Sequence, residues 1–232
     1  MALYHSPLVV TDGLDLYLDA ANTKSYPGSG TTWTDISRNG NNGTLVNGPT
    51  FSNGSIVFDG VDDYVSIGPG TNILPLPYHS LESWFKSPGL GSGMSTGALF
   101  GITYGLIVQI GSGGGLSYYA YTTDSGSQVL LFALSSTGVN LFDNKWHHVV
   151  CTRDAANVNI YVDGVLNNTT GNGGSWSGTN VWSAMDCWIG NNPNNIYYYY
   201  SGLISLSKIY NRALSQAEIT QNFNALRTRF GI

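Results

Sequence analysis

Carboxylates are the first side chains to consider for chemistry, because hydrolysis of a glycosidic bond uses them in pairs. The chain has only two glutamates, Glu82 and Glu218. A hydrolytic pair lies about 5–5.5 Å apart for retention of configuration or about 6.5–9.5 Å apart for inversion. Glu82 stands alone on an expected strand, and Glu218 is expected to cap a helix. Asp62 and Asp63 are neighbours on a strand and therefore point to opposite faces. We expect no catalytic carboxylate pair.

The adjacent histidines His147 and His148 have the same geometric problem, because neighbouring strand residues face opposite sides of a sheet. No serine or cysteine near them lies in a recognisable nucleophile elbow. We interpret these histidines as a half-exposed strand pair. No catalytic residue is assigned, and we expect the protein to have no enzymatic activity.

Asp59, Asp62 and Asp63 form an acidic cluster in the stretch FDGVDDYV. Carboxylate oxygens are the ligands that calcium prefers. Alternatively, these side chains accept hydrogen bonds from backbone amides of a local turn. Both interpretations stay open, and we assign no cofactor and no metal ligand.

Aromatic side chains gather late in the sequence, in stretches rich in asparagine and glycine. Large amphipathic rings suit binding interfaces, because they offer contact area at a low entropy cost. Three interpretations stay open: contact with a sugar, contact with a protein, and packing within a sheet, with Tyr200 in a core position. The candidates for contact with a glycan or a protein are Trp176, Trp182, Tyr197, Tyr198 and Tyr199.

The charge distribution excludes some classes of partner. Only 10% of the residues are charged, the net charge is −5, and the nine Lys and Arg residues are scattered singly. This pattern argues against binding to nucleic acid or to an anionic membrane. The N-terminus lacks both a basic segment and a long apolar run, so we expect no signal peptide or membrane span. Cys151 and Cys187 lie in strand-like stretches and are interpreted as buried core thiols, although a disulfide stays open.

Residues 144–164 contain the pattern that is repeated along most of the chain. Polar and apolar side chains alternate over 146–153, a turn follows, and 158–162 is rich in β-branched and aromatic residues. Asp163 and Gly164 favour a tight hairpin turn with positive φ. About twelve to fourteen such strands predict an all-β sandwich of two antiparallel sheets. Residues 20–48 are expected to form a long loop, and 197–210 a strand.

One helix is predicted, near the C-terminus. Ser215 and Glu218 have the spacing of a capping box. Ile219, Phe223 and Leu226 then fall on one face of the helix. We expect this face to pack on a sheet.

These segments together resemble the laminin-G-like branch of the concanavalin A-like jelly rolls. The resemblance implies a two-sheet jelly roll with one concave and one convex surface. We expect one domain over residues 14–232, preceded by an arm over 1–13. The stretches that carry the resemblance are LDLYLDAAN (14–22), WTDISRNGNNGTLVNGPTF (33–51), VFDGVDDYVSI (57–67), KWHHVVCTRD (145–154), IYVDG (160–164) and KIYNRALSQAEI (208–219).

Two departures from the family pattern bear on function. Glucanases that resemble this chain carry alternating acids on one strand, E-x-D-x-x-E, which this chain lacks. Relatives that resemble calcium-binding members carry an acidic GxIDE stretch before the last strand. Residues 202–206 occupy that place here and read GLISL, without either acid. The resemblance therefore implies binding without catalysis and weakens the case for calcium.

Sequences that resemble this one include sugar-binding modules, adhesion domains and bacteriophage virion proteins. The resemblance to the phage proteins implies a virion structural protein, first of all a capsid decoration protein with a weak glycan-binding face. The alternatives are a tail fibre or tail-tip adhesin that binds a host polysaccharide, and a cellular carbohydrate-binding module. The expected partners are other virion proteins, a host surface glycan and further copies of the chain. Tyr4, His5 and Leu8 in the arm are the expected assembly contacts.

Overall fold

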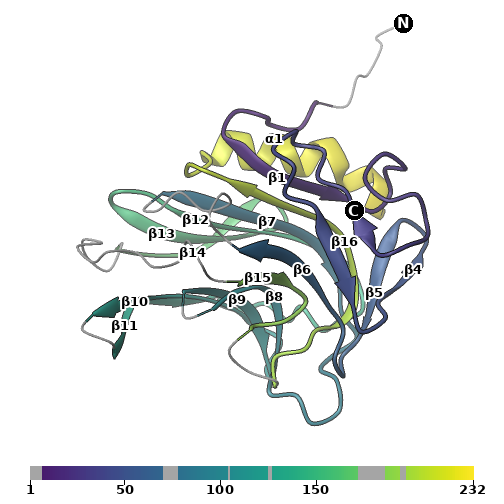
Figure 1. Cartoon of the computed structure of the whole chain (residues 1–232). Coiled ribbons are helices and arrows are strands. Elements are labelled where there is room, and N and C mark those ends of the chain that lie inside the picture. Colours follow the sequence, from purple (N-terminus) through teal and green to yellow (C-terminus); the bar gives the residue numbers. More distant parts are fainter. Residues whose placement is uncertain (1–6, 70–77, 104, 125–126, 172–185, 194–196) are drawn as a thin grey trace, which may run out of the picture.

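Two antiparallel sheets packed face to face form most of the molecule (Figure 1). This confirms the predicted jelly-roll sandwich. The structure is a computed structural model, which describes residues 7–69, 78–103, 105–124, 127–171, 186–193 and 197–232. None of the helices in these residues is long and apolar enough to cross a membrane.

The first sheet lies beneath the C-terminal helix (Figure 1). Its strands, in spatial order, are β14 (Val165–Gly171), β13 (Asn157–Val162), β12 (Trp146–Arg153), β7 (His79–Lys86), β16 (Ser201–Tyr210), β5 (Ser55–Asp59) and β4 (Thr50–Ser52), with β1 (Leu14–Asp19) also paired to β16.

The second sheet lies on the far side of the core from the helix (Figure 1). Its strands, in spatial order, are β11 (Ser127–Ser135), β10 (Leu116–Asp124), β9 (Leu106–Gly111), β8 (Thr96–Ile102), β15 (Asp186–Ile189), β6 (Tyr64–Pro69), β3 (Gly43–Val46) and β2 (Thr32–Trp33).

The core between the sheets follows from the alternation along each strand. Val65, Cys187 and Tyr118 of the second sheet point inward and meet Phe85 and Cys151 of the first. Both cysteines are free and buried, as predicted. Burial raises the pKa of both thiols, that of Cys187 to about 12, so neither is a reactive thiolate at neutral pH.

Helix α1 (Gln216–Leu226) and a short 3₁₀ helix, Arg227–Phe230, cover the outer face of the first sheet. The predicted capping box is present, because the Ser215 side chain accepts from the Glu218 amide and the Glu218 carboxylate accepts from the Ser215 amide. The ring of Trp84 on β7 stacks against Phe223 and Phe230, with centroids 5.7 and 4.2 Å away. The central strands of this sheet, β12, β7 and β16, are therefore buried on both faces.

A charged network lies fully buried between α1 and the first sheet. Lys208 Nζ on β16 donates to Glu82 Oε1 on β7 at 2.9 Å, and Asn222 Nδ2 on the helix donates to Glu82 Oε2 at 2.7 Å. His148 Nε2 lies 3.2 Å from Glu82 Oε1. The Val10 amide donates to Asn222 Oδ1 at 2.7 Å, so the network also holds the segment that precedes β1. Glu82 therefore joins two strands, the helix and the N-terminal segment.

Two strand predictions differ from the structure. The prediction that residues 20–48 form a loop is wrong in part, because β2 and β3 lie within this range. These short strands pair with the second sheet and bury Trp33 and Leu45 in its core. The predicted strand over 197–210 begins only at Ser201, since the residues before it leave the sheet.

We expect Glu82→Gln to destabilise the fold by about 3–5 kcal/mol, because it leaves the Lys208 ammonium buried without a countercharge. Equilibrium urea unfolding at neutral pH measures the effect. Glu82→Gln combined with Lys208→Met should regain most of the loss, because the double variant buries no unpaired charge. Equal stability of Glu82→Gln and the unmodified protein would contradict this role.

The same pair predicts a dependence on pH. Burial alone would raise the pKa of Glu82, but Lys208 and His148 outweigh it and lower the pKa from 4.5 to about 2. Because the folded-state pKa is depressed, this stabilisation is complete above about pH 4.5 and is lost as the pH falls towards 2. We expect the acid-induced loss of stability to be smaller in Glu82→Gln, as measured by urea unfolding between pH 2 and 6.

Candidate functional site

Aromatic side chains gather on the outer face of the second sheet. Val65 and Ile67 of β6 point into the core, so Tyr64 points outward, and Cys187 and Ile189 of β15 place Trp188 outward in the same way. The Tyr64 and Trp188 rings stack with centroids 4.0 Å apart and an interplanar angle of 24°. Both side chains are half-buried. The pair is a partly exposed aromatic platform.

Strand β10 adds two more rings to this face. Tyr118 and Ala120 point inward, so Tyr119 and Tyr121 point outward and are half-buried. The register places Trp188 opposite Gly101, Gly101 opposite Ile107, and Ile107 opposite Tyr119. Since neighbouring strands lie about 4.8 Å apart, Trp188 and Tyr119 are separated by about 14 Å across the sheet.

The chain that follows β15 crosses the outer face between these two aromatic pairs. The Gly190 amide donates to the Leu99 carbonyl at 3.4 Å, and the Ala98 amide donates to the Tyr198 carbonyl at 2.9 Å. A Cβ on Gly101 would lie 2.5 Å from the Asn191 carbonyl oxygen. Glycine at position 101 therefore lets the crossing chain lie directly on β8.

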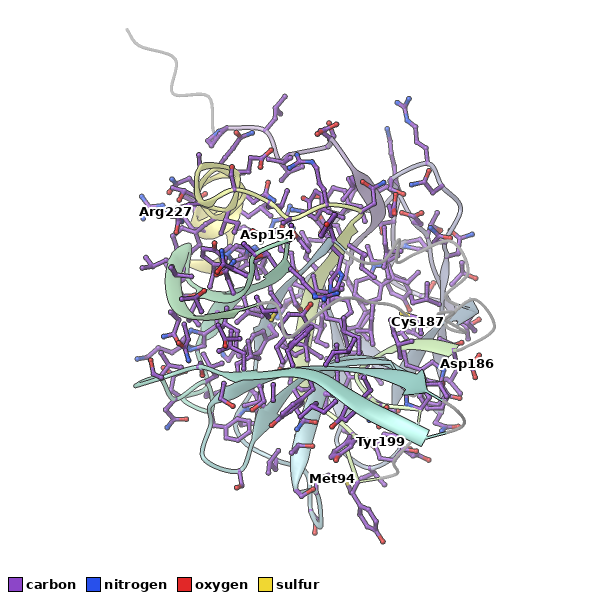
Figure 2. All side chains as sticks on the ribbon, turned by 90° about the vertical axis from the view of Figure 1, so that its left-hand side faces the viewer. Met94, Asp154, Asp186, Cys187, Tyr199 and Arg227 are labelled. Carbon is purple, nitrogen blue, oxygen red and sulfur yellow. The ribbon has the colours of Figure 1, made fainter. Side chains whose placement is uncertain are left out.

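The tyrosines at the end of this crossing extend the aromatic surface. Tyr197 is 55% exposed, and Tyr198 and Tyr199 are half-buried. Figure 2 shows Tyr199 on the side of the second sheet that faces away from the helix. Partial burial raises the pKa of Tyr64, and the neighbouring Tyr199 and Asp186 raise it further. We call Tyr64, Tyr119, Tyr121, Trp188, Tyr198 and Tyr199 the aromatic face.

Burial likewise raises the pKa of Tyr121, and so do Tyr119 and Tyr198 beside it. The phenols of Tyr64 and Tyr121 are therefore neutral at physiological pH, as a tyrosine ordinarily is. Their hydroxyl groups can therefore both donate and accept hydrogen bonds. The aromatic face combines stacking surfaces with neutral polar groups.

The structure shows where some of the candidate contact residues lie. Tyr198 and Tyr199 belong to the aromatic face, and the exposed Tyr197 precedes them. Tyr200 fills the predicted core position, because its ring lies 5.9 Å from Phe58 and its hydroxyl donates to the Lys86 carbonyl at 2.9 Å. The remaining candidates from this stretch, Trp176 and Trp182, lie outside the described residues.

Of the expected assembly contacts, Leu8 is 85% exposed, and Tyr4 and His5 lie outside the described residues. The Leu8 carbonyl accepts from Gln221 Nε2 at 2.7 Å. The helix therefore holds the backbone of this segment while the Leu8 side chain faces solvent.

Sequence reasoning missed Tyr64, Trp188, Tyr119 and Tyr121. Each is an aromatic residue at an outward position of a strand whose alternate residues are apolar and buried. That pattern was visible in the sequence. The pairing of β6 with β15, which stacks Tyr64 on Trp188, was not.

The acidic cluster forms at a turn beside β5. Carboxylate oxygens of Asp59, Asp62 and Asp63 lie within 4.8 Å of one another. The Asp59 amide donates to Asp63 Oδ2 at 3.0 Å, and the Val61 amide donates to Asp59 Oδ1 at 2.8 Å. Burial raises the pKa of Asp63, and the charges of Asp59 and Asp62 raise it further, although the Asp59 amide opposes the shift. The hydrogen bonds that the turn interpretation expects are thus present.

The histidines have structural partners. The prediction of a half-exposed pair is wrong, because His148 is fully buried beneath the helix. His147 lies 3.1 Å from both Asp143 Oδ1 and Asp163 Oδ2. Burial opposes protonation of His147, but the two aspartates outweigh it and raise its pKa. In these positions neither ring resembles an exposed general base.

A separate pocket lies away from the aromatic face, beside β1. It is lined by Thr11, Leu14, Tyr17, Ile36, Ser37 and Arg38. Arg38 adopts a positive φ of 84°, which is unusual for a residue with a side chain. The pocket shares no residue with the aromatic face.

Residues 58–220 match a family model described as the concanavalin A-like lectin/glucanases superfamily. No curated protein sequence is significantly similar to the chain.

Solved structures with a similar fold include three that are less than 20% identical. The Trypanosoma rangeli sialidase has a TM-score of 0.66 and 18% identity, over 94% of this chain and 33% of its own. Domain 4 of AbnA, an extracellular arabinanase from Geobacillus stearothermophilus solved with arabinotriose, has a TM-score of 0.63 and 18% identity, over 90% of this chain and 97% of its own. The botulinum neurotoxin serotype D ligand binding domain, solved with N-acetylneuraminic acid, has a TM-score of 0.61 and 13% identity, over 92% of this chain and 51% of its own.

The chain therefore spans only a third of the sialidase and about half of the neurotoxin domain, but nearly the whole arabinanase domain. At these identities the similarity establishes the fold.

We expect Gly101→Ala to displace the chain that crosses the aromatic face, because its Cβ would lie 2.5 Å from one backbone oxygen and 2.6 Å from the Asn192 Cα. The cost should be about 1–3 kcal/mol by urea unfolding. Near-ultraviolet circular dichroism should change as well, since the crossing chain carries tyrosines. Gly113→Ala is the matched control, because nothing lies within 4 Å of its added Cβ. Unchanged stability and spectrum in Gly101→Ala would contradict the close approach.

Proposed function

Because this chain belongs to the concanavalin A-like lectin/glucanases superfamily, we propose that it is a non-catalytic carbohydrate-binding protein. The aromatic face carries the proposal. It places the stacked Tyr64 and Trp188 rings on one side of a crossing chain and Tyr119 and Tyr121 on the other.

The chemistry of the face fits a saccharide. A sugar ring has an apolar side made of C–H groups, which packs on an aromatic ring, and a rim of hydroxyl groups. Binding sites of this kind combine aromatic surfaces with a few placed polar groups. Here Ser66 pairs with Trp188 in the register, and Thr44 pairs with Ser66. The Ser66 hydroxyl is therefore on the strand next to Trp188, and the Thr44 hydroxyl is one strand further away. Both can bond to the hydroxyl groups of a ligand.

The acids of the chain support binding without catalysis. Glu82 is fully buried and bonded to Lys208 and Asn222. Glu218 is held by Arg212 and by the helix cap, with the Arg212 Nη2 to Glu218 Oε1 distance at 2.6 Å. Neither glutamate is available to act on a glycosidic bond. The arabinanase domain and the neurotoxin domain were each solved with a sugar. A fold of this kind is therefore compatible with sugar binding.

For the biological setting we propose a bacteriophage virion, with the chain as a capsid decoration protein. The exposed Leu8 supports it, since the helix holds the Leu8 backbone through Gln221 and leaves the side chain free for a neighbouring protein. The alternatives are a tail fibre or tail-tip adhesin and a cellular carbohydrate-binding module. A monomer that binds emptied phage heads would favour decoration, whereas a stable trimer that retains a host polysaccharide would favour the adhesin.

We expect Trp188→Ala to weaken binding at least tenfold to whichever glycan the protein retains on an array, because it removes a stacking ring worth about 1.4 kcal/mol or more. Tyr64→Ala should act in the same direction. Isothermal titration with the retained glycan measures both variants. Tyr78→Ala is the control, since Tyr78 is 43% exposed but precedes β7 of the first sheet. Binding that survives Trp188→Ala and Tyr64→Ala would remove the aromatic face as the site.

A further inference from the structure

Every positively charged side chain of this protein lies outside the second sheet. The sequence has no lysine or arginine in residues 39–85, 87–144 or 154–207. With residues 32–33, these ranges hold every strand of the second sheet and the chain that crosses it. None of the four histidines belongs to a strand of the second sheet. The nine cations are Lys24, Arg38, Lys86, Lys145, Arg153, Lys208, Arg212, Arg227 and Arg229.

Several of these cations are engaged on the opposite side of the molecule. Arg229 Nη1 pairs with Asp19 Oδ1 at 2.8 Å, and Arg212 pairs with Glu218. Lys208 is fully buried against Glu82. Figure 2 shows Arg227 beside the helix and Tyr199 on the far side of the second sheet. Cations on that side cannot reach a ligand that lies on the aromatic face.

A negative charge lies beside the aromatic face. Asp186 is exposed at the start of β15, two residues before Trp188. Its carboxylate contributes to the raised pKa of Tyr64, so it acts on the stacked platform itself. A second carboxylate brought close to Asp186 would be repelled, and more strongly as water is excluded from between them.

We infer that the aromatic face selects neutral sugars and rejects sugars that carry a carboxylate or sulfate. This inference rests on the proposed function and names its ligand class. Stacking on Tyr64 and Trp188 is available to any sugar ring. An anionic sugar would lose hydration of its charge without gaining a cationic partner, and it would meet Asp186 as well.

The inferred ligand class differs from the sugar that was solved with one protein of the same fold. The neurotoxin domain was solved with N-acetylneuraminic acid, which is a carboxylated sugar. The second sheet of this chain has no lysine, arginine or histidine to pair with such a group. Arabinotriose, present with the arabinanase domain, is a neutral saccharide of the class that the aromatic face would accept.

The test is a glycan array of neutral oligosaccharides and their uronic-acid, sialylated and sulfated counterparts, followed by titration of matched pairs. We expect the full-length protein to bind neutral members at least tenfold more tightly than anionic ones. This binding should change little with salt, because no ion pair forms.

Asp186→Lys should lower the neutral-to-anionic preference at least tenfold, since it replaces the repelling charge with an attracting one. Asp12→Lys makes the same charge change at a side chain that is 86% exposed beside Arg212, and should leave the preference unchanged. Circular dichroism would check that both variants are folded.

The outcomes distinguish a wrong ligand class from a wrong proposed function. Tight binding of anionic glycans that is lost in Trp188→Ala would overturn the ligand class but keep carbohydrate binding at this face. An unchanged preference in Asp186→Lys would overturn the electrostatic selection. A protein that binds no glycan of either kind would overturn both the ligand class and the proposed function.

Discussion

The buried carboxylate of Glu82 is the constraint on which the arrangement of this protein depends. Removing a charge from water is costly unless it is paired and hydrogen-bonded. Glu82 meets that condition only when β16 brings Lys208 beside it and helix α1 brings Asn222 above it. Through Asn222 the same network bonds the backbone of Val10. One side chain thus fixes the position of the helix and of the segment before β1 over the first sheet.

That fixed cover gives the two sheets different roles. The outer face of the first sheet is occupied by α1 and by aromatic stacking around Trp84. The outer face of the second sheet is crossed by the chain that follows β15, and the rings of the aromatic face remain partly exposed there. We therefore expect the binding chemistry of this sandwich on the second sheet. The segregation of cations follows the same division, because Lys208, Arg212 and Arg229 pair with acids outside the second sheet.

The residue types that first suggested chemistry turn out to have structural roles. Glu218 caps a helix, His147 lies between two aspartates, and His148 is buried. The side chains best placed to meet a ligand are tyrosines and a tryptophan that strand alternation directs outward. This distribution supports recognition of a surface or a saccharide more than it supports turnover.

Much of the fold was determined by local sequence. The Asp163–Gly164 hairpin forms with positive φ at both residues, as the dipeptide predicts. The Ser215–Glu218 capping box forms, and Cys151 and Cys187 are buried in strands. These features depend on residues that are close together in the chain, so they can be predicted from the sequence. The family resemblance, carried by ordered short stretches, supplied the two-sheet architecture.

The candidate site was decided by tertiary structure. Tyr64 stacks on Trp188 only because β6 pairs with β15 in one register, and a shift of one residue would turn either ring into the core. Likewise, the sequence shows no charged partner near Glu82, because Lys208 is 126 residues away along the chain. The sequence alone indicated most of the strands and the alternation of their side chains. The pairing of distant strands decided which outward side chains meet, because that choice depends on burying both sheets at once.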